Sequence, residues 1–146
     1  MFIRHQAEVI ELKNGWKSIF DCDDEGEMKS YVGCKVDIDR ENHTLKMTQL
    51  VIVQSFQDDF DLPGKTPKVP LPVRTMYSKG NEEDLIDKKA QKQYRKAVGK
   101  LLHVSKWTQP TELNAVRELS HFEDGSTQEQ NDGAHNLMKH IVATPN

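Results

Sequence analysis

Residues 94–122 read YRKAVGKLLHVSKWTQPTELNAVRELSHF and decide the fold class of this chain. Apolar side chains recur there at steps of three and four, in two successive runs: Tyr94, Ala97, Val98, Leu101 and Leu102, then Leu113, Val116 and Leu119. This spacing places each run on one face of an α-helix. Thr108-Gln109-Pro110 predicts a break between the two helices, because proline cannot continue the first one.

The N-terminal part predicts one helix and one β-hairpin. Residues 5–20 are expected to be helical because of the spacing of five apolar side chains: Val9, Leu12, Trp16, Ile19 and Phe20. From residue 31 to residue 38 the period changes to two, which predicts a half-buried strand with Val32, Cys34, Val36 and Ile38 on one face. Turn residues at 39–42 and renewed alternation at 44–48 predict the second strand of a hairpin.

The middle of the chain predicts a further helix and a linker. Three consecutive β-branched residues at 51–53 favour a strand, but Ile52, Val53, Phe56 and Phe60 have helical spacing, so a helix over 50–60 is preferred. Residues 63–80 are rich in proline and glycine and predict an extended connector, the one plausible internal boundary.

Near the C-terminus the polar stretch EDGSTQEQNDG (123–133) predicts a loop. Leu137, Met138 and Ile141 then predict a last helix that stops before Pro145. The expected fold class is therefore α+β: an N-terminal helix and small antiparallel hairpin, a Pro-rich linker, and a bundle of roughly three helices. The three segments are residues 1–62, 63–80 and 81–146.

Composition limits the classes of function. The net charge of −3 gives no overall attraction for polyanions. No run of about 18 apolar residues exists, which predicts no membrane span, and the N-terminus lacks the features of a secretory signal. The two cysteines, Cys22 and Cys34, fit a reducing compartment, so the expected location is intracellular, in the cytoplasm or the nucleus.

The acidic cluster at residues 21–27 allows two metal hypotheses. As a calcium loop it has acids at positions one, three and five and Gly26 at position six, but Val32 occupies position twelve, where a bidentate Glu is needed. As a polymerase pair, Asp23 and Asp24 lack the apolar strands that hold such carboxylates around two metal ions. A solvated turn is the preferred interpretation.

Other spacings give no catalytic or metal site. The six histidines form no His-Glu-x-x-His pattern, and the cysteines lack the spacing of a zinc knuckle. The sequence has no Gly-rich phosphate loop and no nucleophile elbow. We therefore expect no catalytic residue, no bound metal and no cofactor in this chain.

A basic run gives the clearest physical signal. From Lys88 to Lys106 the chain has seven Lys or Arg residues and no acid. On a helix, Lys88, Lys92, Lys96 and Lys100 form one ridge, flanked by Lys89 and Arg95. Such a ridge predicts sequence-independent contact with a phosphate backbone. A merely solvated face is the alternative that charge alone leaves open.

Two blocks, GEMKSYVGCKVDIDRENHTLKMTQ (26–49) and YRKAVGKLLHVSKWTQP (94–110), resemble copia-type LTR-retrotransposon reverse transcriptases downstream of their catalytic Asp pair. The resemblance implies the end of the palm, then the thumb and the connection towards ribonuclease H. It implies that Tyr31, Val32 and Gly33 form the primer grip, although a simple strand bulge at Gly33 is the alternative. The chain departs from the family at residues 109–111, which read Gln-Pro-Thr where relatives have Arg-Pro-Asp.

The implied function is that of a non-catalytic C-terminal portion of an RNA-directed DNA polymerase, whose parent enzyme uses Mg²⁺. The implied partners are a primer–template duplex and the rest of the reverse transcriptase polyprotein, with no membrane. Without polymerase or ribonuclease H carboxylates, the chain alone is expected to incorporate no nucleotides. Two alternatives stay open: a domesticated or relic module that binds nucleic acid or protein without enzymatic activity, and a truncated product that barely folds. The expected nucleic-acid-binding residues are Tyr31, Val32, Gly33, Lys88, Lys92, Arg95, Lys96 and Lys100.

Overall fold

The computed structural model describes residues 6–72 and 75–144, and these form an α+β fold of five α-helices, two short 3₁₀-helices and one three-stranded antiparallel sheet. The elements are α1 (Gln6–Ile19), β1 (Ser30–Tyr31), β2 (Cys34–Asp39), β3 (Thr44–Thr48), α2 (Leu50–Asp59), η1 (Glu82–Asp84), α3 (Lys88–Trp107), η2 (Pro110–Glu112), α4 (Leu113–Ser120) and α5 (Gln128–Ala143). The expected fold class and order of elements are confirmed. Four positions used in the predictions lie outside the described residues: His5, Pro145 and the linker residues 73 and 74.

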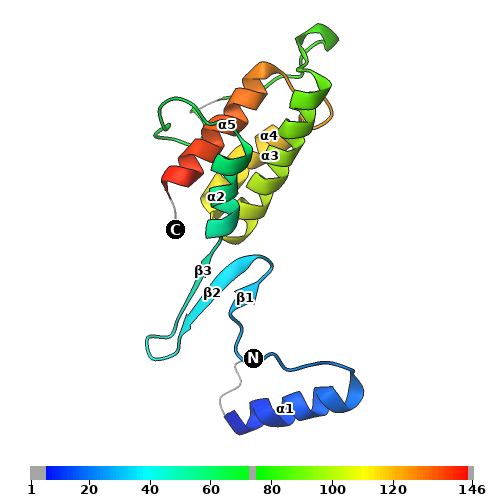
Figure 1. Cartoon of the computed structure of the whole chain (residues 1–146), viewed down its shortest axis with the longest axis vertical. Coiled ribbons are helices and arrows are strands. Elements are labelled where there is room, and N and C mark those ends of the chain that lie inside the picture. The colour runs from blue at the N-terminus through cyan, green and yellow to red at the C-terminus, as the bar shows by residue number, and fades with distance from the viewer. Residues whose placement is uncertain (1–5, 73–74, 145–146) are drawn as a thin grey trace.

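α3 is the central helix of the molecule, and α2, α4 and α5 pack around it (Figure 1). Its predicted apolar stripe is buried, because Tyr94, Val98 and Leu101 are fully shielded from solvent. The Tyr94 hydroxyl donates a 2.6 Å hydrogen bond to the Leu119 carbonyl, which satisfies its polar end inside the core. α2 completes the same core through Phe56 and Phe60.

The last helix starts earlier than the sequence analysis predicted. Residues 128–133 belong to α5, so the predicted loop at 123–133 is wrong over its second half. Thr127 and Gln130 form a capping box that satisfies free backbone N–H groups at the start of the helix. Gly133 lies in close contact with the linker, because a Cβ at that position would lie 2.1 Å from the Tyr77 hydroxyl.

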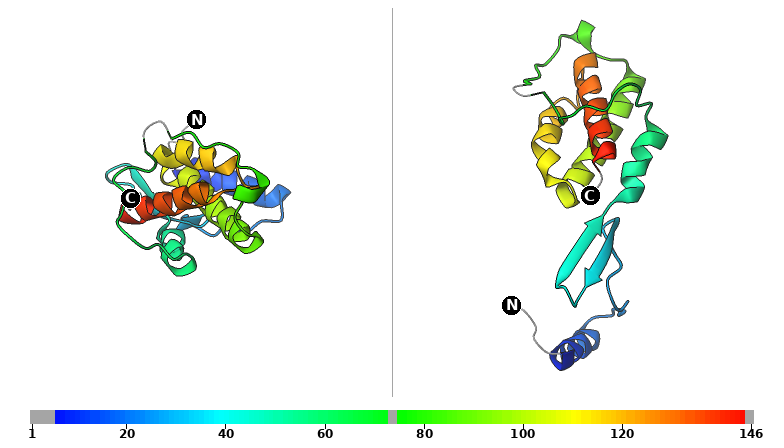
Figure 2. Two further views of the ribbon diagram at one scale, coloured as in Figure 1. Left: turned by 90° about the horizontal axis from the view of Figure 1, so that it is seen from above. Right: turned by 90° about the vertical axis from the view of Figure 1, so that its left-hand side faces the viewer.

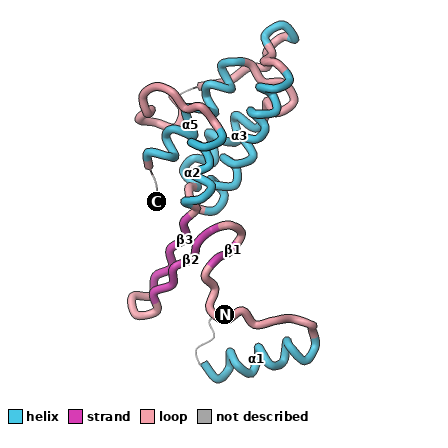
Figure 3. Tube along the Cα trace, in the orientation of Figure 1, coloured by secondary structure: helices cyan, strands magenta, loops and turns pink. Residues whose placement is uncertain are grey.

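The linker lies along α5 rather than projecting into solvent (Figure 3). Lys139 Nζ donates to the Pro63 carbonyl at 2.9 Å, and His140 Nδ1 lies 3.2 Å from the Pro67 carbonyl. Further along, Gln130 Nε2 donates to the Ser78 carbonyl at 2.7 Å. These bonds fasten the extended segment to the helical core at several points.

The predicted continuous strand over residues 31–38 is wrong at Val32 and Gly33, whereas Tyr31 and Cys34 belong to two different strands, β1 and β2. Val32 and Gly33 form a two-residue turn between β1 and β2, with φ angles of 48° and 77°. Positive φ at both central residues is characteristic of a tight hairpin turn that matches the twist of its strands. The predicted hairpin of β2 and β3 is confirmed, with Lys35 opposite Thr48 and Asp39 opposite Thr44.

α1 lies at the opposite end of the molecule from the other helices, and the sheet lies between them (Figures 1 and 2). The predicted N-terminal helix is confirmed, but its apolar face is exposed, with Trp16 65% and Ile19 74% accessible. Among the described residues, no helix combines the length and apolarity that crossing a membrane requires.

Candidate nucleic-acid interface

The outward face of α3 carries an exposed basic stripe, which we define as Lys88, Lys92, Arg95 and Lys106. The spacing of these residues places them along one line of the helix surface. Within the described part of the chain, none of the four forms an ion pair with a carboxylate. The nearest acid in sequence, Asp87, instead accepts from the Ala90 N–H at 2.7 Å and caps the helix. The stripe is therefore free to bind an external anion.

Gly99 lies in the middle of this stripe, seven residues after Lys92 and seven before Lys106. Glycine in a helix interior costs about 1 kcal/mol relative to alanine. No neighbouring atom explains its presence, since a Cβ built there would meet nothing within 4 Å. The position leaves the helix backbone bare between cationic side chains, where a phosphodiester backbone could approach closely.

Two predicted ridge residues, Lys96 and Lys100, are turned towards α2 and paired there, although Lys96 stays partly exposed. Lys96 Nζ lies 2.9 Å from Asp59, and Lys100 Nζ is bonded to the same carboxylate and lies 2.6 Å from Ser55 Oγ. The hydrogen bonds from Lys100 and then Lys96 lower the pKa of Asp59 below its usual value. Both ammonium groups also lie within 6 Å of the Phe60 ring. These two lysines therefore hold α2 against α3.

Tyr31 and the hairpin turn that follows it, Val32-Gly33, pack beside the C-terminal end of α3. The rings of Tyr31 and Trp107 meet edge to face with centroids 5.5 Å apart. A Cβ added to Gly33 would lie 3.6 Å from His103 Nε2, so the imidazole lies over the turn. The structure thus brings Tyr31, Val32 and Gly33 next to the basic stripe, although 55 residues or more separate them from it in sequence.

Val32 is held in a left-handed backbone conformation and is 48% exposed, as is Tyr31. For a β-branched residue this conformation is a rare and costly one, about 1–2 kcal/mol. Gly33, in contrast, adopts positive φ without penalty. The predicted turn residues therefore present an exposed aromatic ring and an exposed aliphatic side chain on a sharply defined backbone.

The acidic residues 21–27 form an extended loop between α1 and β1. Asp24 binds Lys13 Nζ and accepts from the Gly26 N–H, and these bonds, Lys13 first, lower its pKa. Glu27 pairs with Arg40 at 3.0 Å. Among the described residues, no three His, Cys, Asp or Glu side chains converge as a possible metal site.

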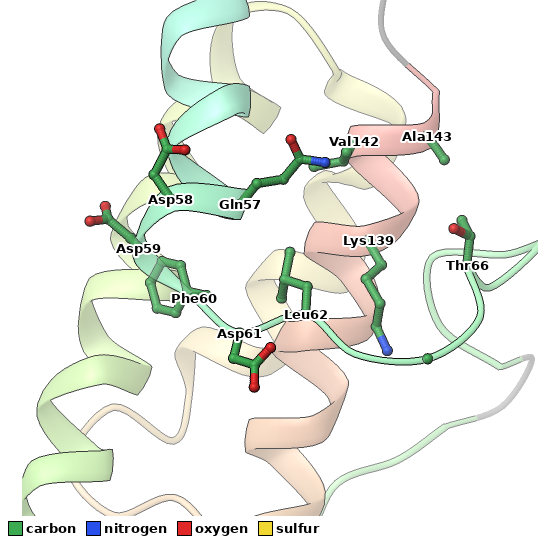
Figure 4. A pocket seen from close by; sticks show the side chains of 11 residues that line it. Gln57, Asp58, Asp59, Phe60, Asp61, Leu62, Thr66, Lys139, Val142 and Ala143 are labelled. Atoms are coloured by element: carbon green, nitrogen blue, oxygen red, sulfur yellow. The ribbon is translucent and has the colours of Figure 1, made fainter.

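A hollow of about 550 Å³ lies between the end of α2, the linker and α5 (Figure 4). Three of its lining residues are acidic: Asp58, Asp59 and Asp61. Its one lysine, Lys139, is bonded to the linker carbonyl of Pro63. This charge would repel phosphates, so the hollow lies outside the candidate interface.

Four further residues belong to the candidate interface although they were not predicted to bind nucleic acid: Gly99, His103, Lys106 and Trp107. The signal for Gly99 and Lys106 was available, because both continue the helical line of Lys92 and Arg95. His103 and Trp107 could not be found from sequence, since they belong to the interface only through their packing on the hairpin turn.

Comparisons of this chain with protein-family models, with curated proteins and with solved structures found no match.

Proposed function

We propose that this chain is the non-catalytic C-terminal portion of a retrotransposon-type reverse transcriptase and grips a primer–template duplex without reading its sequence. One observation carries the proposal: an unpaired basic stripe surrounds a bare helix backbone at Gly99 and lies next to an exposed aromatic turn. Lysine and arginine side chains at this spacing neutralise successive phosphates and position a duplex by its backbone.

The dimensions of the stripe suit a duplex. From Lys88 to Lys106 the helix rises about 27 Å at 1.5 Å per residue. A duplex rises 3.4 Å per base pair, so the stripe would follow about eight base pairs. Tyr31 and Val32, at the C-terminal end of α3, would contact the backbone or an end of the same duplex. The remaining polyprotein is the proposed second partner and would supply the metal-binding carboxylates and Mg²⁺.

Fluorescence anisotropy with a labelled RNA–DNA hybrid of about 16 base pairs, titrated at several salt concentrations, tests the proposal. We expect measurable binding, with an association constant whose logarithm falls linearly with the logarithm of salt concentration. The triple variant K92E/R95E/K106E should weaken binding by at least about tenfold and should flatten the salt slope by about 3.

The matched control is K65E/K68E/K79E, which makes the same charge change on exposed lysines of the linker. It should leave the salt slope nearly unchanged. Equal losses in both triple variants would mean that only net charge matters, and the stripe would then have no special role. No binding by the unaltered chain at low salt would overturn the proposal. A primer-extension assay with Mg²⁺ and deoxynucleotides should give no product above a control without protein.

A further inference from the structure

α1 carries an apolar face that nothing in the described chain covers. Its exposed members are Leu12, Trp16, Ile19 and Phe20, which are between 48% and 74% accessible. An isolated helix of 14 residues is marginal in water, and in proteins such helices are stabilised by packing their apolar face. α1 therefore needs a surface to pack on.

A second uncovered apolar surface lies on the helical core, in a groove between α2 and α5. The groove has a volume of about 680 Å³ and includes Leu50, Val51, Val53 and Val142 in its lining. Val51 is 85% exposed and Leu50 is 59% exposed. Each chain therefore has an exposed apolar helix face and an exposed apolar groove that lie apart from each other.

The connection between α1 and β1 keeps α1 away from the groove of its own chain. Arg40 lies in the turn between β2 and β3, at the end of the hairpin far from α2, and binds Glu27 at 3.0 and 3.2 Å. Lys13 of α1 binds Asp24 in the connection. These two pairs hold the loop at the distal end of the sheet, and α1 lies beyond that end (Figure 2).

The charges beside the two apolar surfaces are complementary. Lys17 lies on one edge of the apolar face of α1 and forms no ion pair among the described residues, whereas Lys13 beside it is bound to Asp24. Asp58 lines the groove, is exposed and has no ion-pair partner among the described residues. Asp61 makes the adjoining surface acidic as well, whereas Asp59 is paired with Lys96 and Lys100. A basic edge of α1 would therefore face an acidic edge of the groove.

We propose that α1 of one copy docks in the α2–α5 groove of a second copy, and that the second copy returns the same contact. The exchange would be symmetric about a two-fold axis, the commonest arrangement of soluble dimers. It would place an amphipathic helix in a groove, a recurring mode of recognition, through side chains at positions i, i+4, i+7 and i+8 counted from Leu12.

Sedimentation velocity over a range of protein concentrations tests the dimer. We expect W16E and V51E each to raise the dimer dissociation constant by at least about tenfold. The matched control for V51E is M76E, because Met76 is 89% exposed on the linker and should leave dimerisation unchanged. K17E and D58K should each weaken the dimer, and the double variant K17E/D58K should recover at least part of the lost affinity.

A mixture of W16E and V51E distinguishes the exchange of α1 between copies from a dimer that forms through another surface. The V51E copy still has an intact α1 and the W16E copy an intact groove, so the mixture should form more dimer than either variant alone. A chain that stays monomeric at every concentration overturns the proposal, as does a dimer insensitive to both substitutions. A monomer whose Trp16 is shielded from a soluble quencher would show docking within one chain, and it would overturn the proposal too.

Discussion

Gly99 occupies a solvent-facing position in the interior of α3, where almost any other residue would make the helix more stable. A methyl group at this position would meet nothing within 4 Å, so the glycine has no packing reason inside the chain. Its neighbours along the stripe are Lys92, Arg95 and Lys106. A bare backbone among cations is best explained by a ligand that approaches closer than a side chain would allow.

Replacing Gly99 by alanine should therefore separate stability from binding. We expect G99A to raise the free energy of unfolding by about 1 kcal/mol, because alanine has the higher helix propensity. The same change should weaken duplex binding, and G99Q should weaken it further because its side chain is longer. Urea unfolding and fluorescence anisotropy measure the two effects.

Gly15 supplies the matched control, since it also lies inside a helix with open space around it, on α1 far from the stripe. G15A should leave duplex affinity unchanged. Unaltered affinity in both G99A and G99Q would show that the ligand does not approach the helix at Gly99.

The contact between α2 and α3 depends on one carboxylate shared by two lysines. Asp59 binds both Lys96 and Lys100, and its pKa is lowered by these bonds. An acid whose pKa is lower in the folded state stabilises the fold at pH values above its ordinary pKa. That contribution is lost as pH falls through the folded-state pKa.

Replacing Asp59 by asparagine should destabilise the protein at neutral pH, and the difference from the unaltered chain should vanish in acid. The change should also tighten duplex binding and steepen its salt dependence, because Lys96 and Lys100 lose their counter-charge. Chemical unfolding from neutral pH into strong acid and anisotropy titrations measure these effects. D58N removes the same charge from an exposed, unpaired neighbour, and equal behaviour of the two variants would contradict the role of Asp59.

At the level of elements, the sequence predicts helices well because their apolar side chains recur at 3.6-residue spacing. α1 and α2 lie within one residue of their predicted ranges at each end, and α3 ends directly before the predicted break at Thr108. The start of α5 was missed although Thr127 and Gln130 carry a recognisable capping pattern. The turn at Val32 could not be expected, because valine disfavours positive φ and the surrounding alternation predicts a continuous strand.

The candidate site was predictable only in part. The basic run could be read from the chain, whereas residues 31–33 were indicated only by the family resemblance, and the proximity of the two arises from the packing of Tyr31 on Trp107. The ion pairs of Lys96 and Lys100 with Asp59 depend on the position of α2, which no local sequence pattern specifies. Tertiary contacts thus decided which of the predicted cations remain available.

Over the whole molecule, one hydrophobic core joins residues from both sides of the linker. Phe56 and Phe60 of α2 lie in the same cluster as Leu101 of α3 and Leu137 of α5. The hairpin contacts this unit through Tyr31 and Trp107, whereas the ion pair of α1 joins it to its own connecting loop. The four helices α2 to α5 should therefore unfold together.

Leu101→Ala tests whether α2 to α5 unfold together, because Leu101 is fully buried near the centre of α3. We expect a loss of about 2–5 kcal/mol in the free energy of unfolding, from lost burial and the cavity left behind. In a W16F background, circular dichroism and Trp107 fluorescence should shift to the same new midpoint. Separate midpoints for the two signals would show that the parts on either side of the linker fold independently.

The two thiols of the chain differ sharply in environment, since Cys22 is exposed whereas Cys34, the first residue of β2, is 1% accessible. Burial also raises the pKa of the Cys34 thiol, which keeps it protonated and unreactive. An alkylating reagent should therefore modify Cys22 at once and Cys34 only when the hairpin lifts from α3. The rate of Cys34 alkylation in the unaltered protein would therefore measure how often the hairpin detaches from α3. A bound duplex that spans the stripe and the turn should lower this rate.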